Sequence, residues 1–187
     1  MKPFFRPVKP FSINQKFGEN TICVSLEEPK KVKNCNGLKP PKGFKSLYGP
    51  KGHLGLDLFT KHSQPVYCAL DGVVYQIDTT VKSGLDVRVE SQVGSRRFQH
   101  IYEHLLGYQP KVGDKVKSGD LIGWADNTGY SSGDHLHFQI NELIKGKWVP
   151  IDPETVLSTL HAQDISSLQE RIARLADLLA DLLRAKK

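Results

Sequence analysis

Residues 131–140 read SSGDHLHFQI, and this stretch decides the fold because it places two histidines one residue apart in a run that otherwise reads as a β-strand. Successive side chains of a strand point to opposite faces of a sheet. His135 and His137 are therefore expected to project from the same face. The sequence thus predicts two imidazoles that open into a common space on one side of a sheet.

The surrounding region, from residue 53 to 149, is built of short apolar or alternating runs. In chain order these runs are HLGLDLF, PVYCAL, GVVYQID, LDVRVES, RRFQHIYEHL, LIGWA and HLHFQI. Glycine-containing turn signals separate them, and many short strands at this spacing are typical of an antiparallel all-β core. We therefore predict a mainly β fold: a small antiparallel sheet, or two packed sheets, with a groove over the sheet and a C-terminal α-helix.

Composition divides the chain into two parts. Residues 1–161 are expected to form one domain, in which residues 27–52, rich in Lys, Pro and Gly, form a long basic loop. Residues 162–187 are expected to form an amphipathic C-terminal helix, because the sequence from residue 164 onward contains no Gly or Pro. A separate short helix is expected to begin at Asp152-Pro153.

The C-terminal helix carries an apolar seam. Its members are spaced alternately three and four residues apart: Ile165, Leu168, Ile172, Leu175, Leu179 and Leu182. This spacing matches the a and d positions of a coiled coil and predicts a homo-oligomer through residues 164–187. The alternative is a helix packed on its own β-domain, which Leu178 and Leu183 favour by widening the apolar stripe.

The net charge of +6 is concentrated near the N-terminus. Residues 1–51 hold 11 Lys and Arg against 3 Asp and Glu. Such a basic arm favours anionic partners, and the alternative is a solvated lysine-rich loop. The aromatic interleaving and the zinc spacing of nucleic-acid modules are missing from it, so no nucleic-acid partner is expected.

No apolar run approaches the roughly 20 residues that span a bilayer, so no stable membrane insertion is expected. Residues 1–18 carry charges and prolines where a secretory signal needs an uninterrupted apolar core, so no signal peptide is expected. The three cysteines are too few for a disulfide framework. Cys23 and Cys35 form a bridge if the chain matures in an oxidising place, and buried free thiols, Cys68 included, are the favoured interpretation.

A second pair of polar residues lies upstream, in GHLGLDL at residues 52–58. His53 and Asp57 are four apart, and the glycines beside and between them argue against a helix. On a strand they share a face, so they converge with His135 and His137 if the two strands are neighbours. Two imidazoles and one carboxylate with an open fourth position are the donor set of a catalytic zinc site.

Several motifs together resemble the lysostaphin/LytM-type zinc endopeptidases, which cut peptide stems or cross-bridges of bacterial peptidoglycan. The resemblance covers roughly residues 11–157. Its motifs, in chain order, are FGEN at 17–20, GHLGLDL at 52–58, VYCALDGVVYQ at 66–76, YEHL at 102–105, VGDKVKSGDLIGWADNTGYSSGDHLHFQI at 112–140 and PIDPETVL at 150–157. They match the family in order, connecting turns included.

The resemblance implies roles for five residues. His53, Asp57 and His137 would bind the zinc, and His104 and His135 would be the catalytic pair. Either of the pair is a candidate for the general base, and His135 is favoured because it shares its strand face with His137.

Four further residues lie outside these roles. Tyr48 is a candidate substrate-binding residue that would help to hold the oxyanion, and its alternative is a packing tyrosine. His62, His100 and His161 match no motif and are expected on the surface.

The implied function is zinc-dependent hydrolysis of a peptide bond in the stem or cross-bridge of peptidoglycan, in the periplasm or cell wall. A phage-encoded or virion-associated protein is the favoured setting, and unconventional bacterial export is the alternative. The main rival is a non-catalytic peptidoglycan-binding or phage-tail protein on the same fold. A biotinyl or lipoyl carrier is disfavoured, because no hairpin offers the lysine tip flanked by Met or Asp that a carrier needs. Which bond is cut stays open.

Overall fold

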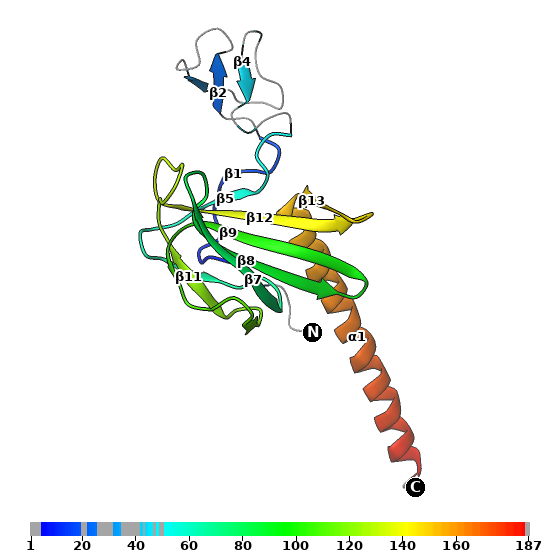
Figure 1. Cartoon of the computed structure of the whole chain (residues 1–187). Coiled ribbons are helices and arrows are strands. Elements are labelled where there is room, and N and C mark those ends of the chain that lie inside the picture. The colour runs from blue at the N-terminus through cyan, green and yellow to red at the C-terminus, as the bar shows by residue number, and fades with distance from the viewer. Residues whose placement is uncertain are drawn as a thin grey trace.

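A computed structural model of the chain describes residues 5–19, 22–25, 32–34, 42, 44–46, 48 and 51–185 (Figure 1). Its strands are β1 (Ile13–Gln15), β2 (Ile22–Ser25), β3 (Val32–Asn34), β4 (Phe44–Ser46), β5 (Leu56–Phe59), β6 (Pro65–Tyr67), β7 (Gly72–Thr80), β8 (Gly84–Val93), β9 (Arg96–Tyr108), β10 (Lys115–Val116), β11 (Leu121–Ala125), β12 (His135–Ile144) and β13 (Lys147–Ile151). One helix, α1 (Pro153–Ala185), follows them. Cys35 lies outside the described residues, and with it the predicted pairing with Cys23.

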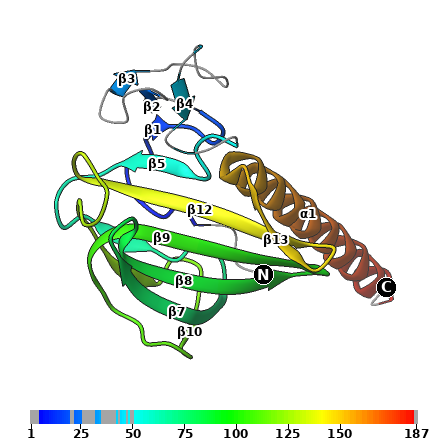
Figure 2. The same cartoon turned by 45° about the horizontal axis from the view of Figure 1, so that its top comes forward.

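The main sheet is antiparallel, and its strands run in the order β1-β5-β12-β9-β8-β7-β10. Figure 2 shows β12, β9, β8 and β7 side by side. β13 pairs with β12, and β11 pairs with both β6 and β9. The predicted fold class, mainly antiparallel β with a C-terminal helix, is confirmed.

Alternation along β12 and β9 separates a core face from a polar face. Leu136, Phe138 and Ile140 of β12 are fully buried, and Phe138 packs against Tyr102 of β9 with ring centroids 5.3 Å apart. His135 and His137 alternate with these residues and therefore point to the opposite face of the sheet. The hydrophobic core thus lies under one face and leaves the other for the histidines.

The prediction that His100 lies on the surface is wrong. His100 is completely buried on β9, because it shares the core-facing parity of Phe98 and Tyr102. Its two ring nitrogens lie 2.6 Å from the Ser91 hydroxyl and 2.8 Å from the Tyr102 hydroxyl, so it is a hydrogen-bonded core histidine.

Residues 27–52 are not the continuous loop that their composition predicts. β3 and β4 lie within this range and pair on either side of β2, which gives a small antiparallel sheet of order β3-β2-β4. β3 (VKN) and β4 (FKS) escape detection because each is three residues long and holds a single apolar residue in a Lys-, Pro- and Gly-rich context. The remainder of this range lies outside the described residues, apart from Lys42, Tyr48, Lys51 and Gly52.

The C-terminal helix is one continuous element of 33 residues and begins at Pro153. Asp152 caps it, since its carboxylate accepts hydrogen bonds from the Glu154 amide at 3.0 Å and from the Thr155 hydroxyl at 3.0 Å. Proline suits the first helical position because its missing N–H would have no partner there. The expected division after residue 161 therefore falls inside this helix, and the separation into two domains stays a prediction.

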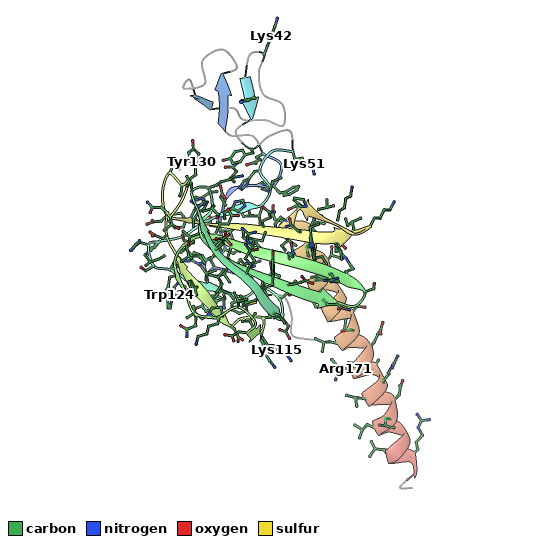
Figure 3. All side chains as sticks on the ribbon, in the orientation of Figure 1. Lys42, Lys51, Lys115, Trp124, Tyr130 and Arg171 are labelled. Carbon is green, nitrogen blue, oxygen red and sulfur yellow. The ribbon has the colours of Figure 1, made fainter. Side chains whose placement is uncertain are left out.

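The start of α1 packs into the core. Val156, Leu157 and Leu160 are buried against the sheet. From residue 165 onward the helix runs away from the sheet in Figures 1 and 2, and Figure 3 places Arg171 on this projecting part. In the described part of the chain, no helix is both long enough and apolar enough to cross a membrane.

Candidate metal centre

The sheet register brings the predicted residues together at its centre. β5 and β12 are antiparallel neighbours, and Asp57 lies directly opposite His137. On the other side of β12, His137 lies opposite Glu103 of β9. His53 is not on a strand, contrary to expectation, because it lies in the turn before β5.

Two glycines allow the turn that carries His53. Gly52 adopts a positive φ of 73°, and a Cβ there would lie 2.3 Å from the Gly18 carbonyl oxygen. A Cβ on Gly55 would lie 2.5 Å from the Phe138 carbonyl oxygen and 3.0 Å from the His137 ring. The His53 backbone is fixed by hydrogen bonds in both directions to residues 18 and 19 after β1. The chain therefore passes close to β12 at this point, and only glycine fits.

Three donor atoms form a nearly equilateral triangle. His53 Nε2 lies 2.9 Å from His137 Nδ1 and 3.1 Å from Asp57 Oδ1, and His137 Nδ1 lies 3.0 Å from Asp57 Oδ1. A tetrahedral zinc with ligands at 2.0–2.1 Å separates its ligand atoms by roughly 3.4 Å. The three atoms need to part by only a few tenths of an ångström to hold such an ion.

The charges of the triangle suit a cation. Burial raises the pKa of Asp57, but hydrogen bonds from His137 and His53 outweigh it and hold that pKa far below its usual range. Burial lowers the pKa of His137, but its hydrogen bond to Asp57 prevails and leaves the pKa raised. The carboxylate is therefore ionised, and one positive charge is favoured beside it.

The hydrogen-bond partners of the two histidines show which ring nitrogens carry a proton and which keep a lone pair. His53 Nδ1 lies 3.2 Å from the Lys16 carbonyl, which can only accept, so Nδ1 donates and Nε2 keeps its lone pair. The proton on His137 Nδ1 is then shared between His53 Nε2 and Asp57 Oδ1. A metal ion in the triangle would take the place of that proton. The donor set and the orientation of His53 both fit a zinc ligand set.

His104 and His135 stand beside the triangle without belonging to it. Their ring centroids are 4.7 Å apart, and His135 Nε2 lies 3.6 Å from Asp57 Oδ1. His135 Nδ1 donates to the Gly133 carbonyl at 2.8 Å, and His104 Nδ1 donates to the Thr128 carbonyl at 2.7 Å. In both rings the carbonyl acceptor fixes the proton on Nδ1, so Nε2 is left as a proton acceptor.

His104 reaches this face through an irregularity in β9. By strand parity it belongs with Tyr102 on the core face. The pairing register shifts on both sides of it, in β8 and in β11, and its φ is +64°. The His104 backbone still donates to Ser83 and accepts from Asp126, at 2.9 Å each. The bulge thus redirects the imidazole towards His135 while the backbone stays paired.

Burial sets the protonation of His104. Burial, with the neighbouring imidazole of His135 as the next cause, lowers the pKa of His104 to about 4. The ring is therefore neutral near pH 7, the form in which it accepts a proton.

Tyr48 lies on the far side of His53, with ring centroids 5.2 Å apart. Its hydroxyl donates to Gln15 Oε1 at 3.2 Å. Gln15 lies opposite Asp57 in the β1–β5 register and is buried, and its Nε2 has no hydrogen-bond partner among the described residues. No sequence pattern points to Gln15, because its position depends on the pairing of β1 with β5, a strand about 40 residues later. The role of Tyr48 in substrate binding stays a prediction.

The two other unassigned histidines differ in their surroundings. His62 is on the surface as predicted, with 62% of its side chain exposed. The side chain of His161 lies outside the part of the chain that the structure describes.

Comparison with known proteins places the chain in a family. The pattern of Peptidase family M23 matches residues 51–153, more than half of the chain. The chain belongs to peptidase family M23. The matched residues include the triangle, His104 and His135, and the predicted resemblance to lysostaphin-type enzymes is confirmed.

Individual M23 relatives support the assignment. Glycyl-glycine endopeptidase ALE-1 of Staphylococcus capitis is 39% identical over 88 residues, which cover 46% of this chain and 24% of that protein. The catalytic domain of lysostaphin from Staphylococcus simulans superposes with a TM-score of 0.56 and 25% identity over 79% of this chain and 92% of that domain. A zinc-containing peptidase from Vibrio cholerae has a TM-score of 0.57 and 27% identity, over 81% of this chain and 39% of that one. The match to the curated relative thus spans about a quarter of its length.

Proposed function

We propose that the chain is a zinc-dependent endopeptidase that hydrolyses a peptide bond in the stem or cross-bridge of bacterial peptidoglycan. The observation that carries the proposal is the triangle of His53, Asp57 and His137 with two unliganded imidazoles beside it. ALE-1, which is named a glycyl-glycine endopeptidase, and lysostaphin, which is described as an antimicrobial peptidase, support the reaction class. The V. cholerae neighbour, a zinc-containing peptidase, supports the metal.

In this proposal His53 Nε2, His137 Nδ1 and Asp57 Oδ1 hold the zinc. When bound, the zinc would act as a Lewis acid on the scissile carbonyl and would lower the pKa of a bound water to about 7. Lys16 accepts from the outer nitrogen of His53 and so fixes the ligand's orientation. The core under β12 fixes the position of His137, because its neighbours Leu136 and Phe138 are fully buried.

His135 and His104 divide the proton transfers. His135 Nε2 accepts the proton of the attacking water, because it is an unprotonated nitrogen 3.6 Å from a ligand oxygen. His104 holds the second position, where its Nε2 accepts a hydrogen bond from the attacking water and so orients it. His135, now protonated, then delivers this proton to the leaving amine.

Two substitutions test this division. Asp57→Ala should lose the strongly bound zinc of the triangle together with activity, since it removes one corner of the triangle. His135→Ala should keep the zinc and lose turnover, which metal content and release of new amino termini from purified walls would measure. Val112→Ala, at an exposed side chain outside both groups of histidines and carboxylates, is the control for turnover. Loss of the strongly bound zinc in His135→Ala would contradict the ligand assignment.

The alternative is a non-catalytic wall-binding or phage-tail protein on the same fold. It predicts bound zinc with no release of amino termini from any wall. Digestion of walls of several chemotypes, with mass spectrometry of the new termini, separates the two functions and identifies the bond. The phage-encoded or virion-associated setting remains a proposal from the sequence, to be tested by locating the gene product in virions or in host lysates.

We also propose that the projecting part of α1 pairs with the same helix of a second copy. Seven apolar side chains on it are between 45% and 66% exposed: Ile165, Leu168, Ile172, Leu175, Leu178, Leu179 and Leu183. Among the α1 side chains that the structure describes, the apolar ones buried against the β-domain are Val156, Leu157 and Leu160, all in the first turns. Ile at two of the three a positions of the seam, Ile165 and Ile172, and Leu at its d positions favour two strands.

Light scattering on two full-length variants tests this pairing. Leu175→Glu changes a seam residue, and Ala173→Glu adds the same charge two residues away, outside the seam. We expect the first variant to have half the mass of the wild type or less, and the second to keep the wild-type mass. A wild-type monomer would overturn the pairing and leave the metal chemistry untouched.

A further inference from the structure

A second group of metal-binding residue types lies beside the M23 centre and shares no residue with it. His62, Asp126 and Asp134 each offer one donor atom, and these atoms lie within 4.8 Å of one another. One of His62's ring nitrogens, Nδ1, is 2.9 Å from Asp126 Oδ1. Three separate segments supply the group: the turn after β5, the end of β11 and the turn before β12.

Backbone hydrogen bonds hold the three segments in place. Ser63 donates to Ala125 at 2.9 Å and Ala125 donates to Gln64 at 2.8 Å, so the turn that carries His62 is fixed to the end of β11. Asp126 forms an antiparallel bridge with His135, the residue after Asp134. The backbone of the fold therefore brings the three segments that carry these residues together.

The two carboxylates of the group give it a negative charge that favours binding of a cation. Asp126 is buried, with 12% of its side chain exposed, and Asp134 is half-buried. Two carboxylates this close repel each other, and one imidazole with 62% exposure offsets at most one of the two charges. No hydrogen bond to the Asp134 carboxylate is found among the described residues. A divalent ion would neutralise both carboxylates at once.

The donor types indicate which ion. Calcium and magnesium prefer oxygen-only sets, whereas an imidazole nitrogen with carboxylate oxygens suits zinc and similar transition metals. We propose that His62, Asp126 and Asp134 form a second divalent transition-metal site, with zinc as its first choice. The site is weaker than the triangle, because donors up to 4.8 Å apart must close to roughly 3.4 Å around the ion.

A metal ion at the second site would affect His135, which stands beside the M23 triangle. The turn between Asp126 and Asp134 contains Ser131 and Gly133, whose oxygens lie 3.1 and 2.8 Å from His135 Nδ1. An ion that joins the two ends of this turn would restrict it and would hold the imidazole of His135 in its present orientation. This effect rests on the proposed function, whereas the metal site itself does not.

Zinc stoichiometry tests the site directly. The tag-free full chain is stripped with a chelator and dialysed against buffered free zinc, and its bound zinc is then counted. We expect two zinc ions per wild-type chain and one per chain in His62→Ala and in Asp134→Asn. Asp57→Ala should keep one, the weaker ion. Glu170→Gln, an exposed change on α1 with the charge change of Asp134→Asn, should keep two.

Two results would overturn the site. One is a single zinc per wild-type chain at saturation, which would leave His62 and Asp126 as an ion pair. The other is a second zinc that persists in both His62→Ala and Asp134→Asn. If excess calcium displaced the second zinc, the assignment of this site to transition metals would be wrong.

Discussion

The buried His100 should make the stability of the protein depend on pH. In either tautomer of its neutral ring, one nitrogen donates and the other accepts, which matches one hydrogen bond each with Ser91 and Tyr102. Burial disfavours the positive charge that a second ring proton would add. Burial accordingly lowers the pKa of His100 from 6.5 to about 3.

The sign and size of the effect follow from linkage. The native state keeps His100 neutral down to about pH 3, whereas the unfolded chain takes up a proton below about pH 6.5. Stability is therefore complete above pH 6.5 and falls as the pH drops towards 3. At pH 5 the pH lies about 1.5 units below the unfolded pKa, which corresponds to about 2 kcal/mol of the free energy of unfolding.

Urea unfolding at pH 8 and pH 5 measures this loss. Tryptophan fluorescence reports the transition, and a chelator removes contributions from bound metal. His100→Gln supplies the control because it cannot titrate, and His100→Phe replaces it if that variant does not fold. We expect the wild type to lose about 2 kcal/mol more than the variant between the two pH values. Equal losses in wild type and variant would refute the reasoning.

Three further predictions concern the metal centre, the base and the helix. Gly55→Ala should lower zinc affinity and thermal stability, since its Cβ would lie 2.5 Å from the Phe138 carbonyl; Gly107→Ala, whose nearest contact would be 3.7 Å, should leave both unchanged. Because burial lowers the pKa of His104 to about 4, protonation of this ring should reduce wall cleavage as the pH falls through about 4, and a cleavage rate that stays constant between pH 5 and pH 3.5 would contradict its role at the water. Asp152→Ala should lower the free energy of unfolding by about 1 kcal/mol, measured by urea unfolding, because α1 loses its cap.

The sequence predicts the part of the site that depends on local alternation. His135 and His137 share a face because they are two apart on β12, and that follows from strand geometry alone. The pairing of Asp57 with His137 needs the register of β5 against β12, which pattern does not specify. His53 was harder to place, because its turn is held by residues 18 and 19, more than 30 positions earlier in the chain.

β9 shows why parity fails where a strand is irregular. His100 and His104 have the same parity, so alternation assigns them to one face. The structure buries His100 in the core and turns His104 to the metal side, because the bulge at position 104 interrupts the alternation. Such a bulge is set by pairing with β8 and β11 together, and neither partner is visible in the local sequence.

The positive φ of His104 means that a substitution that stabilises the fold at this position would also remove an imidazole from the active site. A non-glycine residue in the left-handed region costs roughly 1–2 kcal/mol, and glycine removes that cost. His104→Gly therefore relieves backbone strain while it deletes an imidazole that we place at the reaction. A variant library sorted only for heat resistance would enrich glycine at this position and drift towards inert protein, so any directed evolution of this scaffold has to select on wall cleavage in every round.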